Sequence, residues 1–223
     1  MIRGVIFDLD GVLLDSIPYW KGLGETYVRS LGKEPIENMG NILFSMSMEQ
    51  GAEWLRDSFS LQKTPEQIEQ DMEEMLRDFY YNEVGLKTGA SDLLEELCGL
   101  GLPLVAATSS PREHVTRALT RNNVIDAFNG IFTNGEVGES KHSPLIYTLA
   151  ATSLDSIPST TFVFEDSLYA LKTAANAGFH TVGIFDSAGE PNQEGLKTAA
   201  QYYFENPLGF LTQLKEGGIA EFN

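Results

Sequence analysis

Two carboxylates, Asp8 and Asp10, directly follow the first apolar run of the sequence. A second acidic pair, Glu165 and Asp166, follows a later apolar run in the same way. Charged groups next to buried strands cost free energy unless a partner group or a ligand compensates their charge. In an open α/β sheet, ligands bind at the carboxyl ends of the strands, which is where all four acids fall. The pattern therefore predicts that the two acidic pairs meet in one crevice and take part in chemistry there.

Hydroxyl groups and a cation should reach the same crevice. Thr108, Ser109 and Ser110 end another apolar run, and their hydroxyls and backbone amides at the start of a helix would form an anion site. Lys141 lies in a loop, two residues before a Ser-Pro pair. Acids, hydroxyls and a cation gathered in this way are hard to explain by packing. Ser110 itself is more simply a helix cap, because the proline and Glu113 that follow it match a capping box.

The elements that position these groups are predicted from the apolar pattern. Five short runs are continuously apolar, which is typical of parallel strands covered on both faces. Helical segments with clear start and stop signals separate most of them, so the sequence predicts an α/β fold with a doubly wound parallel sheet. The predicted strands are 2–7, 104–107, 130–133, 162–164 and 181–185.

One stretch interrupts the alternation of strands and helices. Almost a hundred residues separate the first two predicted strands, far more than one crossover needs, and their pattern is helical throughout. Thr64 begins a Thr-Pro-Glu-Gln segment that predicts a capped helix start. We therefore expect an α/β core formed by residues 1–15 and 84–223, and an inserted all-helical cap domain at 16–83.

Composition limits the classes of function. The chain has 223 residues, 42% of them apolar, and a formal net charge of −17. Such a charge argues against sequence-independent binding to nucleic acid, and a phosphate site here must be positive locally. The sequence offers no membrane span and no secretory signal. The single cysteine, Cys98, allows no internal disulfide, so we expect a cytoplasmic protein.

Four motifs in order now suggest a family. The segments Asp-Leu-Asp-Gly-Val at 8–12, Thr-Ser-Ser at 108–110, Lys141 before Ser-Pro, and Glu-Asp-Ser at 165–167 resemble the signature motifs of the haloacid dehalogenase-like superfamily. The helical insert is similar to that family's small cap, as found in the subgroup of β-phosphoglucomutase and phosphoglycolate phosphatase. The resemblance covers essentially the whole chain and implies a Mg²⁺-dependent phosphatase that acts on a small phosphorylated metabolite.

The resemblance also implies a role for each acid. Asp8 would attack phosphorus and form an aspartyl-phosphate, and Asp10 would protonate the leaving oxygen and then deprotonate water. Asp8, Asp166 and the backbone carbonyl of Asp10 would bind Mg²⁺ directly, and Glu165 would bind it through water. Thr108 and the Ser109 amide would hold phosphate oxygens, as the resemblance further implies. Lys141 would neutralise both the nucleophile and the transferred group.

Alternatives remain within the same fold. A sugar phosphomutase or an inorganic pyrophosphatase would use the same motifs, and a non-catalytic binding module is disfavoured by the intact acids and lysine. Mutase-like relatives carry a histidine early in the first cap helix and an arginine in the next loop. Here Trp20 takes the helix position and the loop at 43–48 has no arginine, although Lys21 or Arg56 could supply charge. We therefore expect a hydrolase, as a monomer or weak homodimer.

Overall fold

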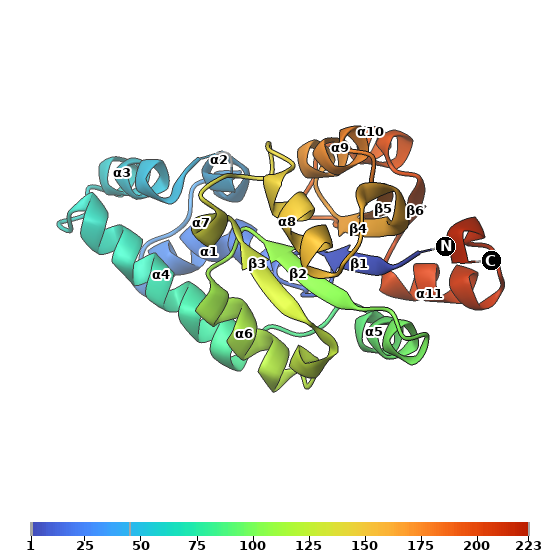
Figure 1. Cartoon of the computed structure of the whole chain (residues 1–223). Helices are drawn as coiled ribbons and strands as arrows, with labels where there is room; N and C mark the ends of the chain where they lie inside the picture. The colour runs from blue at the N-terminus through green and yellow to red at the C-terminus, as the bar shows by residue number, and fades with distance from the viewer. Residues whose placement is uncertain (1, 45, 223) are drawn as a thin grey trace.

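The computed structural model describes residues 2–44 and 46–222, apart from the side chain of residue 44. Six strands form one sheet in the order β3-β2-β1-β4-β5-β6, and all neighbouring pairs run parallel. This arrangement confirms the predicted α/β class (Figure 1). The strands are β1 (Gly4–Phe7), β2 (Leu104–Thr108), β3 (Gly130–Thr133), β4 (Thr161–Glu165), β5 (His180–Ile184) and β6 (Tyr202–Phe204).

Both faces of the sheet are covered, which explains why the central strands are apolar throughout. Val5 and Phe7 of β1 pack in the cluster that includes α5, α6 and α11, whereas Ile6 packs in the cluster of α8 and α9. Figure 1 shows these two layers of helices on opposite sides of the strands. The helices are α5 (Ala90–Gly99), α6 (Arg112–Arg121), α7 (Asn134–Val137), α8 (Leu145–Ser153), α9 (Leu168–Asn176), α10 (Gln193–Ala199) and α11 (Pro207–Lys215).

The five predicted strands all exist, with ends that differ by at most two residues. The sixth strand, β6, was not predicted. It has only three residues, all of them partly exposed, and it lies at the edge of the sheet next to β5. So short a strand has no room for the continuous apolar run that marks the buried strands.

The long segment between β1 and β2 is helical, as predicted. Thr64 caps α4 through a reciprocal pair: its hydroxyl accepts from the Gln67 amide, and the Gln67 side chain accepts from the Thr64 amide. Residue 45 of the loop that we compared with mutases lies outside the described residues. The division into a core and a cap at 16–83 stays a prediction. The inserted helices are α1 (Ile17–Ser30), α2 (Met39–Phe44), α3 (Met48–Phe59) and α4 (Pro65–Asn82).

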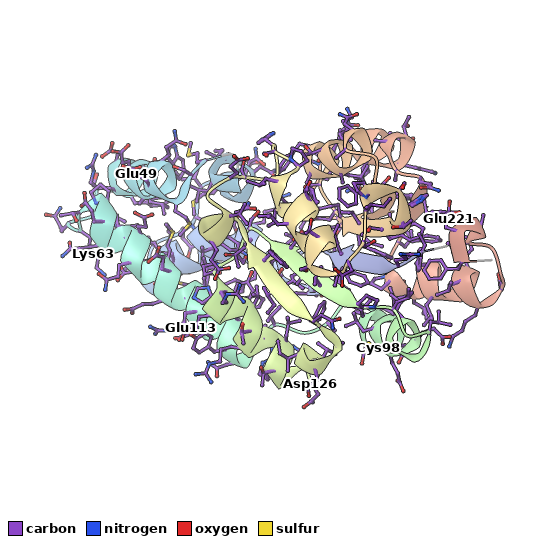
Figure 2. All side chains as sticks on the ribbon, in the orientation of Figure 1. Glu49, Lys63, Cys98, Glu113, Asp126 and Glu221 are labelled. Carbon is purple, nitrogen blue, oxygen red and sulfur yellow. The ribbon has the colours of Figure 1, made fainter. Side chains whose placement is uncertain are left out.

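Two chain segments join the inserted helices to the sheet, and they pair with each other. The Asp15 amide donates to the Gly85 carbonyl at 3.0 Å, and the Lys87 amide donates to the Leu13 carbonyl at 2.8 Å. Helix α4 also lies along α6, and Figure 2 labels Glu113 of α6 near this contact. The helices α1–α4, which we call the insert, are therefore held against the carboxyl end of the sheet.

No helix in the described part of the chain is long and apolar enough to cross a lipid bilayer.

Candidate active site

The two acidic pairs meet because their strands are neighbours. Asp8 follows β1 and Glu165 ends β4, and these strands pair in register, with Phe7 opposite Phe164. Asp8, Glu165 and Asp166 each offer an oxygen, and these three oxygens lie within 4.8 Å of one another. All three side chains are buried, Glu165 completely. The crevice predicted from the strand ends is thus present in the structure.

Lys141 lies among these carboxylates. Its ammonium is 2.6 Å from Asp8 Oδ1 and 2.7 Å from Glu165 Oε1, and the side chain is only 2% exposed. Tyr147 of α8 donates its hydroxyl to the same Glu165 oxygen at 2.6 Å. A buried lysine is stable only with such partners, because burial alone lowers the pKa of Lys141, while Asp8 and Glu165 raise it above its ordinary value.

One ammonium does not balance three buried carboxylates. Burial raises the pKa of Asp8, and Glu165 and Asp10 raise it further against the opposing effect of Lys141. Burial likewise raises the pKa of Asp166, with Asp8 and Glu165 adding to the effect. Glu165 Oε2 is buried and has no hydrogen-bond partner. An unpaired buried oxygen and an excess of hard negative ligands are what a divalent cation site provides, so this acidic cluster fits a metal ion.

Gly11 lets the chain pass close to the acidic cluster. Its φ is +79°, a conformation that residues with a side chain rarely adopt. A Cβ atom at this position would lie 2.2 Å from Asp166 Oδ2, far inside contact distance. The glycine that follows the second aspartate is therefore needed for both its backbone angle and its lack of a side chain.

Asp10 is held by three hydroxyl groups. Ser16 donates to Oδ1 at 2.6 Å, Tyr80 also donates to Oδ1, and Ser110 donates to Oδ2 at 2.6 Å. The indole N–H of Trp20 in turn donates to the Tyr80 hydroxyl at 2.9 Å. Burial, together with the charge of Asp10 and the hydrogen bond to it, raises the pKa of Tyr80, so the phenol stays protonated and able to donate.

The capping role predicted for Ser110 is wrong. Helix α6 begins after Pro111 without a side-chain cap, and the Ser110 hydroxyl bonds to Asp10 instead. Thr108 is buried, and its hydroxyl accepts from the Ser110 amide at 3.1 Å. The Ser109 hydroxyl accepts from Asn134 at 2.8 Å. The Thr-Ser-Ser segment thus positions a partner for Asp10 in addition to offering hydroxyls at the site.

A pocket of about 410 Å³ opens above the acids, which suits a small molecule. Lys141 is the only lysine or arginine among its described lining residues, and it is already paired with Asp8 and Glu165. Neither Lys21 nor Arg56 lines it: Lys21 bonds to the Ala188 carbonyl, and Arg56 pairs with its neighbour in sequence. The lining residues are Asp8, Asp10, Ile17, Trp20, Ser109, Ser110, Pro111, Lys141, Asp166, Ser167, Tyr169, Gly189, Glu190 and Pro191.

Two tyrosines of the site were missed by sequence reasoning. Tyr147 lies in the expected helix after Lys141, but an apolar helix face gives no sign that a hydroxyl reaches Glu165. Tyr80 lies in the insert, seventy residues from its partner Asp10. Only the folded structure brings either pair together.

The site consists of acidic pairs at the ends of neighbouring parallel strands, with a buried lysine between them. This arrangement defines an α/β enzyme with a site suited to an anionic substrate and a cation. Residues 5–184 match the family of haloacid dehalogenase-like hydrolases. Because this match covers most of the chain, the protein belongs to that family. The predicted family, fold and enzymatic class are therefore confirmed.

Relatives match along most of their length. The chain is 25% identical to a phosphorylated carbohydrates phosphatase of Thermotoga maritima, over 96% of this chain and 99% of that protein. It is 28% identical to the phosphoglycolate phosphatase of Escherichia coli, over 82% of this chain and 81% of that protein. A solved structure from Thermotoga maritima, provisionally described as a β-phosphoglucomutase, superposes with a TM-score of 0.85 at 25% identity, covering 96% of this chain and 99% of that one.

Proposed function

We propose that this protein is a Mg²⁺-dependent phosphatase that hydrolyses a small phosphorylated carbohydrate or polyol. The observation that carries the proposal is the position of Lys141 between Asp8 and Glu165, beside a second aspartate held by hydroxyl groups. A nucleophile, an acid–base group and a cation would thereby all line the pocket. The names of the relatives support a phosphate ester as the substrate.

The donor set supports a hard divalent cation such as Mg²⁺. Asp8 and Asp166, with the backbone carbonyl of Asp10, would hold Mg²⁺, and Glu165 would bind it through water. When bound, the ion supplies positive charge for the substrate phosphate and for the charge that develops on its oxygens. Lys141 supplies a second, permanent positive charge from the protein itself.

The protein groups divide the reaction into two steps. Asp8 attacks phosphorus, the bond between phosphorus and the ester oxygen breaks, and Asp10 gives a proton to the leaving oxygen. A water molecule then attacks the aspartyl-phosphate and gives a proton to Asp10, which releases inorganic phosphate and restores both aspartates. The Ser109 amide and the Thr108 hydroxyl would orient phosphate oxygens during both steps.

The lining of the pocket favours a substrate with one phosphate and an uncharged body. A second phosphate or a carboxylate would find no free lysine or arginine among the described lining residues, and would meet the carboxylate of Glu190. Trp20 and Tyr169 present aromatic surface instead. This supports sugar and polyol monophosphates over bisphosphates and over phosphoglycolate.

A substrate panel tests the proposal. Purified protein is assayed for phosphate release from p-nitrophenyl phosphate, glucose 6-phosphate, glycerol 3-phosphate and phosphoglycolate, with Mg²⁺ and with excess chelator. We expect Mg²⁺-dependent release, with neutral-bodied monophosphates preferred to phosphoglycolate. Full activity in chelator contradicts the metal assignment, and a preference for phosphoglycolate contradicts the proposed substrate class.

A further inference from the structure

One partner of Asp10 comes from the last helix of the insert. Tyr80 lies in the last turn of α4, whereas Ser16 precedes α1 and Ser110 follows β2. The Tyr80 side chain is fully buried, and its ring stacks on His114 of α6. The tyrosine is thus fixed between the insert and the core, with its hydroxyl directed at the acid–base group.

The three hydroxyl groups around Asp10 all donate to its carboxylate. The hydroxyls of Tyr80 and Ser110 also lie 3.3 Å apart, and in that longer contact either can be the donor. The indole N–H of Trp20 can only donate, so the Tyr80 oxygen accepts from it and directs its own proton to Asp10. A carboxylate has about four acceptor positions. Tyr80 and Ser16 occupy both positions on Oδ1, and Ser110 occupies one on Oδ2. One position on Oδ2 remains for the proton that Asp10 exchanges with the reacting groups.

We propose that Tyr80 is a positioning residue that aims the free Oδ2 position of Asp10 at the leaving oxygen of the substrate. This inference rests on the proposed phosphatase function. Without the Tyr80 bond, one position on Oδ1 is open in addition to the one on Oδ2. The carboxyl group can then turn and carry its proton on an atom that does not face the ester oxygen. The lost rate therefore depends on how much the leaving group needs a proton.

Two substrates of similar size separate this effect from a general loss of activity. The leaving group of benzyl phosphate is a strongly basic alkoxide that needs a proton. The leaving group of p-nitrophenyl phosphate is a stable phenolate anion that does not. The value of kcat/KM includes only the steps up to departure of the leaving group, so hydrolysis of the phosphoenzyme does not affect it. The ratio of the two kcat/KM values is also unaffected by any inactive fraction, because that fraction lowers both equally.

The experiment measures both kcat/KM values for the wild type and for Tyr80→Phe. Complete loss of a general acid costs about 10²–10⁴-fold, so mispositioning should lower kcat/KM for benzyl phosphate by about 10- to 100-fold. The value for p-nitrophenyl phosphate should fall by less than about threefold. In an Asp10→Asn background, Tyr80→Phe should cause no further loss with benzyl phosphate, because the group it positions is absent.

Tyr27→Phe is the matched control. Tyr27 is also a buried tyrosine of the insert, and its hydroxyl also donates to a carboxylate, that of Asp71, at 2.8 Å. This variant should leave the ratio of the two substrates unchanged. An unchanged ratio in Tyr80→Phe, or an equal change in Tyr27→Phe, overturns the positioning role. Failure of the wild type to hydrolyse either phosphate ester overturns the proposed function instead.

Discussion

Lys87 offers a stability test that is independent of the chemistry. It lies in the second segment joining the insert to the sheet, and its ammonium bonds to the carbonyls of Gly11 and Phe185, each at 2.8 Å. The same ammonium pairs with Asp186 at 2.9 Å, and the two side chains are only 11% and 4% exposed. Three segments that surround the site are therefore joined by one cation.

Lys87→Met keeps the unbranched side chain and removes the charge. The carboxylate of Asp186 would keep its hydrogen bonds from the Ala188 and Gly189 amides but would lose its cation in a buried position. Breaking a buried ion pair from one side costs about 3–5 kcal/mol. For a chain of this length each kcal/mol lowers the melting temperature by about 2–4 °C. We therefore expect melting to fall by about 6–20 °C.

Thermal melting monitored by circular dichroism measures this change, and two further variants serve as comparisons. Arg77→Met removes an exposed ion pair, 3.4 Å long with side chains 47% and 66% exposed, and should cost about 0–1 kcal/mol. Adding Asp186→Asn to Lys87→Met removes the uncompensated charge and should recover part of the lost stability. The reasoning is refuted if Lys87→Met costs no more than Arg77→Met, or if Asp186→Asn lowers stability further.

Four other predictions concern the active site. Asp8→Asn should abolish turnover and formation of a phosphoenzyme detected by mass spectrometry; more than trace activity would mean that the nucleophile is wrongly assigned. Asp10→Asn should slow phosphoenzyme hydrolysis by about 10²–10⁴-fold, measured by single-turnover kinetics, and a smaller loss would contradict its role as the base. In excess chelator, Asp8 and Asp166 have raised pKa values in the folded state. Above pH ~4 the folded protein therefore keeps protons that the unfolded chain has released, so the free energy of unfolding should fall as the pH rises from about 4. Asp8→Asn should accordingly melt higher than the wild type at pH 8 but not at pH 4, and equal melting at pH 8 would argue against a buried excess of negative charge. With β-glucose 1-phosphate, its bisphosphate activator and Mg²⁺, free phosphate should outpace glucose 6-phosphate; conversion faster by more than about tenfold would instead establish a mutase.

The fold could be predicted because its signals are local. Parallel strands buried on both faces require continuous apolar runs, and some helix starts are marked by capping groups such as Thr64, whose predicted bonds are present. The same reasoning placed the acids, since residues that follow parallel strands reach the same edge of the sheet, whatever their distance in sequence. The edge strand β6 escaped prediction because partial burial imposes no such pattern on three residues.

The partners of Asp10 could not be predicted in this way. Ser110 stands before a proline and three residues before a glutamate, which favours a cap, but a partly buried carboxylate needs donors more than a helix end near solvent does. The hydroxyl of Tyr80 has no local signal at all, because its partner lies on another element. Local pattern therefore identifies the charged groups, and tertiary packing decides which neutral groups orient them. For this protein, variants of Ser110 and Tyr80 should separate the presence of an acid–base group from its orientation.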